Sequence, residues 1–113
     1  MAVIDRQEVL ERLGGDEELY AEICALFLRD GLMMLSRLKT ELAGGTLEIA
    51  TRYAQSIRSM AANVGAKDLA ALADKAEQVG RAGDAKAFEG YLPQLEQQLL
   101  AVLQLLNRQH SGS

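Results

Sequence analysis

The sequence predicts an all-α protein: an antiparallel up-down-up-down four-helix bundle with a short extra helix at its N-terminal end. Apolar residues make up 49% of the chain and aromatic residues only 4%, a balance that favours helices packed through Leu, Ala and Ile. The single proline and the few β-branched residues point the same way. At 113 residues the chain is one domain. We expect residues 1–110 to form it and 111–113 to be a tail or linker remnant.

Capping residues mark the start of each expected helix, and glycines mark the ends. Asp5, with Glu8 as its capping-box partner, begins the first helix, and Asp16 and Asp84 begin two others. Thr46 begins the third helix. Glycine pairs or single glycines end each of the first four helices. The expected helices span about residues 6–13, 17–43, 46–64, 67–81 and 85–109.

Pro93 lies inside the last of these helices. It has no backbone N–H to donate to the preceding turn. We therefore expect a kink or a break between Phe88 and Pro93.

Each long helix carries an apolar stripe at helical spacing, which is typical of a bundle core. Loops of two to four residues make neighbouring helices antiparallel. The predicted core residues are Leu19, Ile23, Leu26 or Phe27, Met34, Leu38 and Leu42 of the second helix; Ala50, Ala54, Ile57, Ala61 and Val64 of the third; Leu69, Leu72 and Ala76 of the fourth; and Leu92, Leu95, Leu99, Val102 and Leu106 of the last.

Composition excludes several classes of function. The net charge of −4 gives no basic face for nucleic acid. The chain has no apolar run long enough to span a membrane and no signal-peptide pattern, so we expect a cytoplasmic protein without direct membrane contact. Cys24 is the single cysteine and reads as a small packing residue in a reducing compartment. One His and one Cys cannot build a metal site, so we expect neither a metal nor another cofactor.

The third helix presents a polar face opposite its apolar stripe. At about 100° per residue, Gln55 lies about 140° from the centre of the stripe and Ser59 nearly opposite it. Gln55, Arg58, Ser59 and Ala62 follow i, i+3, i+4, i+7 spacing and so share one exposed side.

Residues 54–66 of this helix (AQSIRSMAANVGA) resemble the active helix of histidine phosphotransfer (HPt) domains, whose pattern runs Ala-His-x-Leu-Lys-Gly-x-x-x-x-x-Gly. Residues 13–19 (LGGDEEL) and 27–30 (FLRD) extend the resemblance over about residues 5–106. It implies a four-helix bundle that exchanges phosphate with receiver domains. In the family the exposed histidine carries the phosphoryl group, the lysine compensates its charge, and the glycine leaves room for the receiver.

The chain departs from the family at these three positions. Gln55 stands in place of the histidine, and an amide has no nucleophilic lone pair with which to form a phosphoramidate. We therefore expect no catalytic residue and no enzymatic activity. Arg58 keeps the lysine's charge and could bind an anion through a wider fork. Ser59 adds a hydroxymethyl group where the family leaves space. His110, the single histidine, lies at the end of the last helix and is not the expected phosphoacceptor.

The function expected from this resemblance is non-catalytic docking to a response-regulator receiver domain or to a histidine kinase, which would modulate a phosphorelay. Leu28 and Leu32 are candidates for the apolar part of the docking face, against ordinary packing as the alternative.

Two other readings stay open. The first is an active phosphotransfer domain inactivated by an engineered His-to-Gln change, although three altered signature positions favour natural loss of the site. The second is a structural bundle that forms a homo-oligomer, for instance through its leucine-rich last helix.

Overall fold

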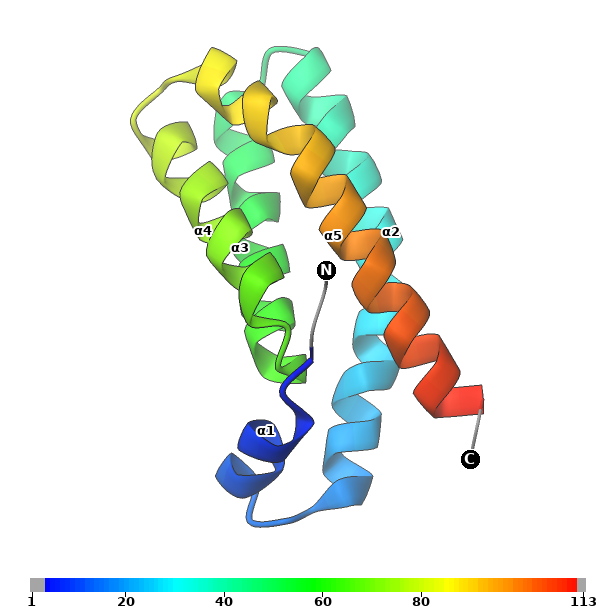
Figure 1. Cartoon of the computed structure of the whole chain (residues 1–113). Coiled ribbons are helices and arrows are strands. Elements are labelled where there is room, and N and C mark those ends of the chain that lie inside the picture. The colour runs from blue at the N-terminus through cyan, green and yellow to red at the C-terminus, as the bar shows by residue number, and fades with distance from the viewer. Residues whose placement is uncertain (1–3, 112–113) are drawn as a thin grey trace.

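The structure, a computed structural model, describes residues 4–111, and every regular element in this range is an α-helix (Figure 1). This confirms the all-α prediction. The helices are α1 (Arg6–Arg12), α2 (Glu17–Ala43), α3 (Leu47–Val64), α4 (Lys67–Arg81) and α5 (Ala85–Ser111).

The four long helices pack side by side, and α1 lies across one end of the bundle (Figure 1). α3 packs between α2 and α4, while α5 completes the bundle against α4 and α2. α1 contacts the beginning of α2 and the end of α3, so it sits at the end of the bundle where α3 terminates.

The helix starts follow the capping pattern of the sequence. The side chains of Asp5, Asp16 and Asp84 accept hydrogen bonds from the backbone N–H groups three residues on, over 3.1, 2.9 and 3.0 Å. Thr46 precedes α3 but makes no side-chain cap. The capping box at α1 is incomplete, because the N–H of Asp5 donates to the carbonyl of Gly65 over 2.8 Å.

That contact explains why residue 65 is a glycine. Gly65 has a φ of +88° and ends α3 in the left-handed conformation. A Cβ there would lie 2.7 Å from the carbonyl oxygen of Asp5. Only glycine therefore allows both the turn into α4 and the docking of α1.

Of the kink or break expected between Phe88 and Pro93, the break is absent, since α5 is one continuous helix from Ala85 to Ser111 with Pro93 inside it. Phe88, in its first turns, is fully buried and anchors this end of α5 in the core. The missing N–H at Pro93 costs one hydrogen bond of the helix ladder, and the packing of Phe88 and Leu95 on either side holds the helix together.

The predicted stripe of α3 is buried, with Ala50, Ala54, Ile57, Ala61 and Val64 all at most 1% exposed. The stripes of α4 and α5 are buried except for Leu72 and Leu92, which are only partly buried against the core. The stripe predicted on α2 is correct only in part. Leu19 and Leu26 are 39% and 46% exposed, whereas Leu38 and Phe27, the alternative to Leu26, are buried as predicted. Ile23, Met34 and Leu42 are only partly buried. The buried face of α2 consists of Tyr20, Cys24, Phe27, Gly31, Leu35 and Leu38.

Tyr20 links α2 to the end of α3. Its hydroxyl donates to the carbonyl of Val64 over 2.9 Å, in the buried interior. Burial raises the pKa of Tyr20 and also that of the Cys24 thiol one turn on. Cys24 is 8% exposed and packs in the core, and a raised pKa disfavours its thiolate form.

Candidate functional site

The expected polar face lies on one side of α3. Gln55, Ser59 and Ala62 are exposed, and Arg58 is partly buried beside them. Gln55 is in the middle of the helix, with more than two turns of α3 on either side. The structure thus brings together the four α3 residues that the sequence pattern grouped.

Arg58 does not point away from the bundle but reaches across to α4. Its Nε donates to Oε1 of Glu77 over 2.7 Å, and Oδ1 of Asp74 lies 3.8 Å from the same nitrogen. The second carboxylate oxygen of Glu77 pairs with Arg81. Glu77 therefore bridges two arginines, and the charge of Arg58 is compensated within the domain.

Glu77 is the residue that the sequence analysis missed. It is 4% exposed and lies among Ala73, Ala76 and Gly80 on the buried side of α4. A carboxylate in such a place needs a cationic partner. The signal was a charged residue directly beside the small residues of a buried stripe. The tight turn at Gly65 sets α3 antiparallel to α4, and this arrangement makes Arg58 of α3 the cationic partner of Glu77.

α3 and α4 approach each other closely at Thr51 and Gly80. A Cβ on Gly80 would lie 2.1 Å from Oγ1 of Thr51 and 3.1 Å from Cδ2 of Phe88. Thr51 in turn donates its hydroxyl to the carbonyl of Leu47 over 2.8 Å. This close approach brings Glu77 within reach of Arg58.

A shallow hollow lies beside Gln55, between the first turns of α3 and the end of α4. It carries charged groups of both signs, and each arginine in it is paired: Arg52 with Glu48 over 3.3 Å and Arg81 with Glu77. The lining residues are Leu47, Glu48, Thr51, Arg52, Gln55, Gly80, Arg81 and Gly83.

The structure does not bring Leu28 and Leu32 to this face. Leu32 is 53% exposed and lines a different hollow, shared by α2 with Glu96 of α5. Leu28, one helical turn earlier, is partly buried on the same flank of α2. The two leucines therefore lie toward α5, whereas the polar side of α3 lies toward α4. The sequence could not distinguish the two flanks of α2.

Other exposed apolar side chains of α2 lie away from the α5 side. A helix turns by about 100° per residue, so Leu26 and Met33 lie about 120° and 100° around α2 from Leu32. They are 46% and 44% exposed. Met60 of α3 is partly buried on the neighbouring flank. Of the four consecutive apolar residues 32–35, Leu32 and Met33 face outward, as the run predicted.

Among the described side chains, neither a histidine nor a cysteine lines the hollow beside Gln55. His110 lies in the last turn of α5, and its side chain falls outside the described residues. Within the described part of the chain, no cluster of His, Cys, Asp or Glu side chains is arranged to hold a metal ion. None of the helices in residues 4–111 has the length and hydropathy of a membrane span.

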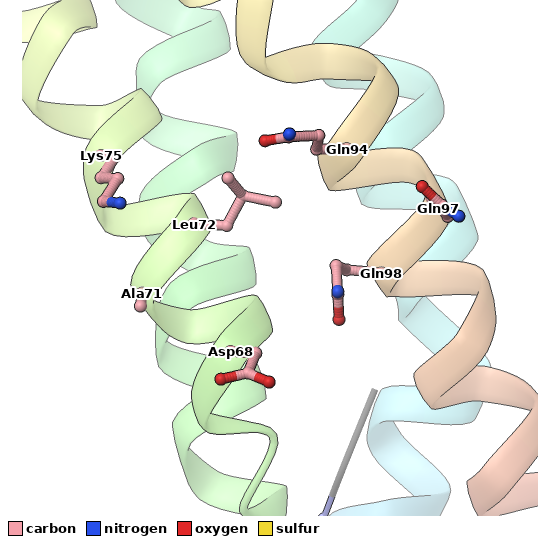
Figure 2. Close-up of a pocket in the computed structure, with 7 residues that line it drawn as sticks. All are labelled: Asp68, Ala71, Leu72, Lys75, Gln94, Gln97 and Gln98. Atoms are coloured by element: carbon pink, nitrogen blue, oxygen red, sulfur yellow. The ribbon is translucent and has the colours of Figure 1, made fainter. Parts of the chain in front are cut away.

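A second hollow lies between α4 and α5, away from Gln55 (Figure 2). Leu72 of α4 and Gln94 and Gln98 of α5 point into the space between the two helices. Oε1 of Gln98 is buried without a hydrogen-bond partner among the described residues. A bound water would satisfy this oxygen, and the lining residues form no recognisable catalytic set.

Comparison with known families identifies the domain. The sequence model of the Hpt domain family matches residues 22–105, from the early part of α2 to the later part of α5. This chain belongs to the Hpt domain family. Hpt domains are phosphotransfer carriers of two-component phosphorelays rather than true enzymes, and they interact with receiver domains and histidine kinases. Comparison with curated proteins and with solved structures gave no match.

Proposed function

We propose that this chain is an Hpt-like docking module that binds a receiver domain and neither accepts nor passes a phosphoryl group. The observation that carries the proposal is that Gln55 is exposed at the middle of α3, and the resemblance of residues 54–66 to the family pattern aligns it with the phosphorylated histidine. A neutral amide there can donate and accept hydrogen bonds to a partner. It cannot form the phosphoramidate on which phosphotransfer depends.

The docking surface in this proposal is centred on Ser59 and includes Gln55 and the exposed part of Arg58. Ala62 marks its edge, because Arg12 of α1 donates to the Ala62 carbonyl over 3.2 Å and occupies that end of the face. Leu26 and Met33 supply apolar contact area from the neighbouring flank of α2. Occupying a receiver without passing phosphate would make the domain a competitor or a scaffold in a phosphorelay.

The leucines of the last helix support docking over self-association. Leu95, Leu99, Val102 and Leu106 are at most 1% exposed and pack into the core of their own bundle. Among the described residues of α5, Leu100 is the large apolar side chain that is exposed, at 42%, while Leu92 and Leu103 are partly buried against the core. A helical zipper needs an apolar seam that repeats over several turns, so the buried leucines favour packing within the bundle as the reason for the leucine-rich pattern.

A titration of purified receiver domains from the same genome with this chain and two variants tests the proposal. Ser59→Glu places a charge at the centre of the face and should change stability by less than about 0.5 kcal/mol. Receiver affinity should fall by about 1 kcal/mol or more if the site is desolvated in the complex. Ala54→Glu is the contrast, because Ala54 is 0% exposed and a buried charge should unfold the bundle.

A matched pair on α2 tests which flank takes part. Met33→Asp should weaken receiver binding, and Leu32→Asp should leave it unchanged, since the two side chains are similarly exposed but lie on different sides of the helix. An unchanged affinity in both Ser59→Glu and Met33→Asp would show that this face does not dock a receiver.

A further inference from the structure

The charges around Gln55 are balanced within the domain. Three arginines surround the position: Arg52 and Arg58, one turn before and after it, and Arg81 across on α4. Three carboxylates pair with them, those of Glu48, Asp74 and Glu77. The formal charge of this group is therefore zero. A further cation, Arg12 of α1, contacts α3 at the carbonyl of Ala62. Ala62 lies about 10 Å from Gln55 along the axis of α3.

Arg58 is the arginine placed to meet a group that approaches Gln55, and it is held in place. Its partner Glu77 is 4% exposed and has its other oxygen on Arg81. Moving Arg58 onto a phosphoryl group would leave a carboxylate that is only 4% exposed with one cation fewer, which is costly. Because Nε takes the bond to Glu77, an approaching partner would meet Arg58 through its Nη groups, and the positive charge behind them is already compensated by Glu77 and Asp74.

From this balance, and on the basis of the docking function proposed above, we infer that the Gln55 face recognises the unphosphorylated form of its receiver and gains nothing from the phosphoryl group. Phosphorylation of the receiver adds negative charge and strong acceptor oxygens. These strengthen binding where the docking partner offers a cation whose charge is not already compensated. The face offers instead the Gln55 amide, the Ser59 hydroxyl and the outer N–H groups of Arg58, all suited to neutral hydrogen-bonding partners. Such a module would hold receivers that are not signalling.

The test uses the receiver domain that binds this chain most tightly in the titrations described above. The chain is titrated with that receiver twice, once with the receiver unloaded and once with it loaded with beryllofluoride as a phosphoryl mimic. The wild-type chain should bind the loaded form no more tightly than the unloaded form. A gain of about 5-fold or more on loading, the lower range of ordinary coupling between two ligands, would overturn the inference while leaving docking intact. Failure of every receiver to bind in either form would overturn the docking function itself.

Two variants connect the result to the ion pairs. Glu77→Gln keeps the shape of the side chain and an oxygen for Arg58 but removes the charge, so the loaded receiver should now bind tighter than the unloaded one by about 5-fold or more. Asp74→Asn, at a more exposed position, should shift the preference in the same direction by a smaller factor and does not put the fold at risk. Glu89→Gln, exposed on α5, is the control and should behave as wild type. If neither Glu77→Gln nor Asp74→Asn changes the preference, charge compensation is not its cause.

Discussion

Arg58 and Glu77 form the bond that defines this domain's site: Nε of the arginine donates to Oε1 of a glutamate that is 4% exposed, over 2.7 Å. The bond ties the exposed side of α3 to the interior of α4. A side chain that could contact a phosphoryl group is thereby used to complete the fold.

Arg58→Ala should destabilise the domain by about 1–2 kcal/mol, because it leaves Glu77 buried with Arg81 as its remaining partner. The value is moderate since the Arg58 side chain is itself 36% exposed. Urea denaturation measures it. Arg52→Ala is the control, as its pair with Glu48 is fully at the surface and should change stability by less than about 0.5 kcal/mol. Equal losses in the two variants would mean that the buried carboxylate has no special need of Arg58.

Gly80→Ala should destabilise the bundle by about 1–3 kcal/mol, because the added methyl group overlaps Oγ1 of Thr51, where α3 and α4 approach each other closely. Gly90→Ala is a matched change at a helical glycine with nothing within 4 Å, and it should stabilise by about 0.5 kcal/mol. Thermal melts of both variants report the difference. Adding Thr51→Ala to Gly80→Ala should recover part of the loss, and no recovery would place the clash elsewhere.

Gln55→His should restore at best weak phosphotransfer from a phosphorylated receiver, because Ser59 occupies space beside the new imidazole. Adding Ser59→Gly should raise the rate by about 10-fold or more, since small misplacements of reacting groups are costly. Single-turnover kinetics with both variants measure the ratio. Equal rates in the single and double variants would show that residue 59 does not crowd the approach.

Most helix boundaries followed from the sequence because they are set locally. Aspartates at positions 5, 16 and 84 cap the helices that follow them, and Gly65 can adopt a positive φ that other residues avoid. The buried face of α2 did not follow from the sequence in the same way. The four successive apolar residues 32–35 are spread around the whole helix, so their pattern does not show which side is buried.

The partners of the site residues depend on tertiary packing. The pairing of Arg58 with Glu77 requires the register of α3 against α4, which the contact of Thr51 with Gly80 fixes. The position of Leu32 next to α5 rather than α3 requires knowing on which side of α2 each neighbour packs. The residues of one helix face could therefore be grouped from sequence, but their neighbours on other helices could not.

Native mass spectrometry of this chain mixed with a receiver carrying an acyl phosphate tests the central claim most directly, because it reports binding and phosphotransfer together. We predict a one-to-one complex that contains this chain, with the mass of the phosphoryl group remaining on the receiver or lost to hydrolysis and never found on the chain. Addition of one phosphoryl mass to this chain, at His110 or elsewhere, would contradict the account.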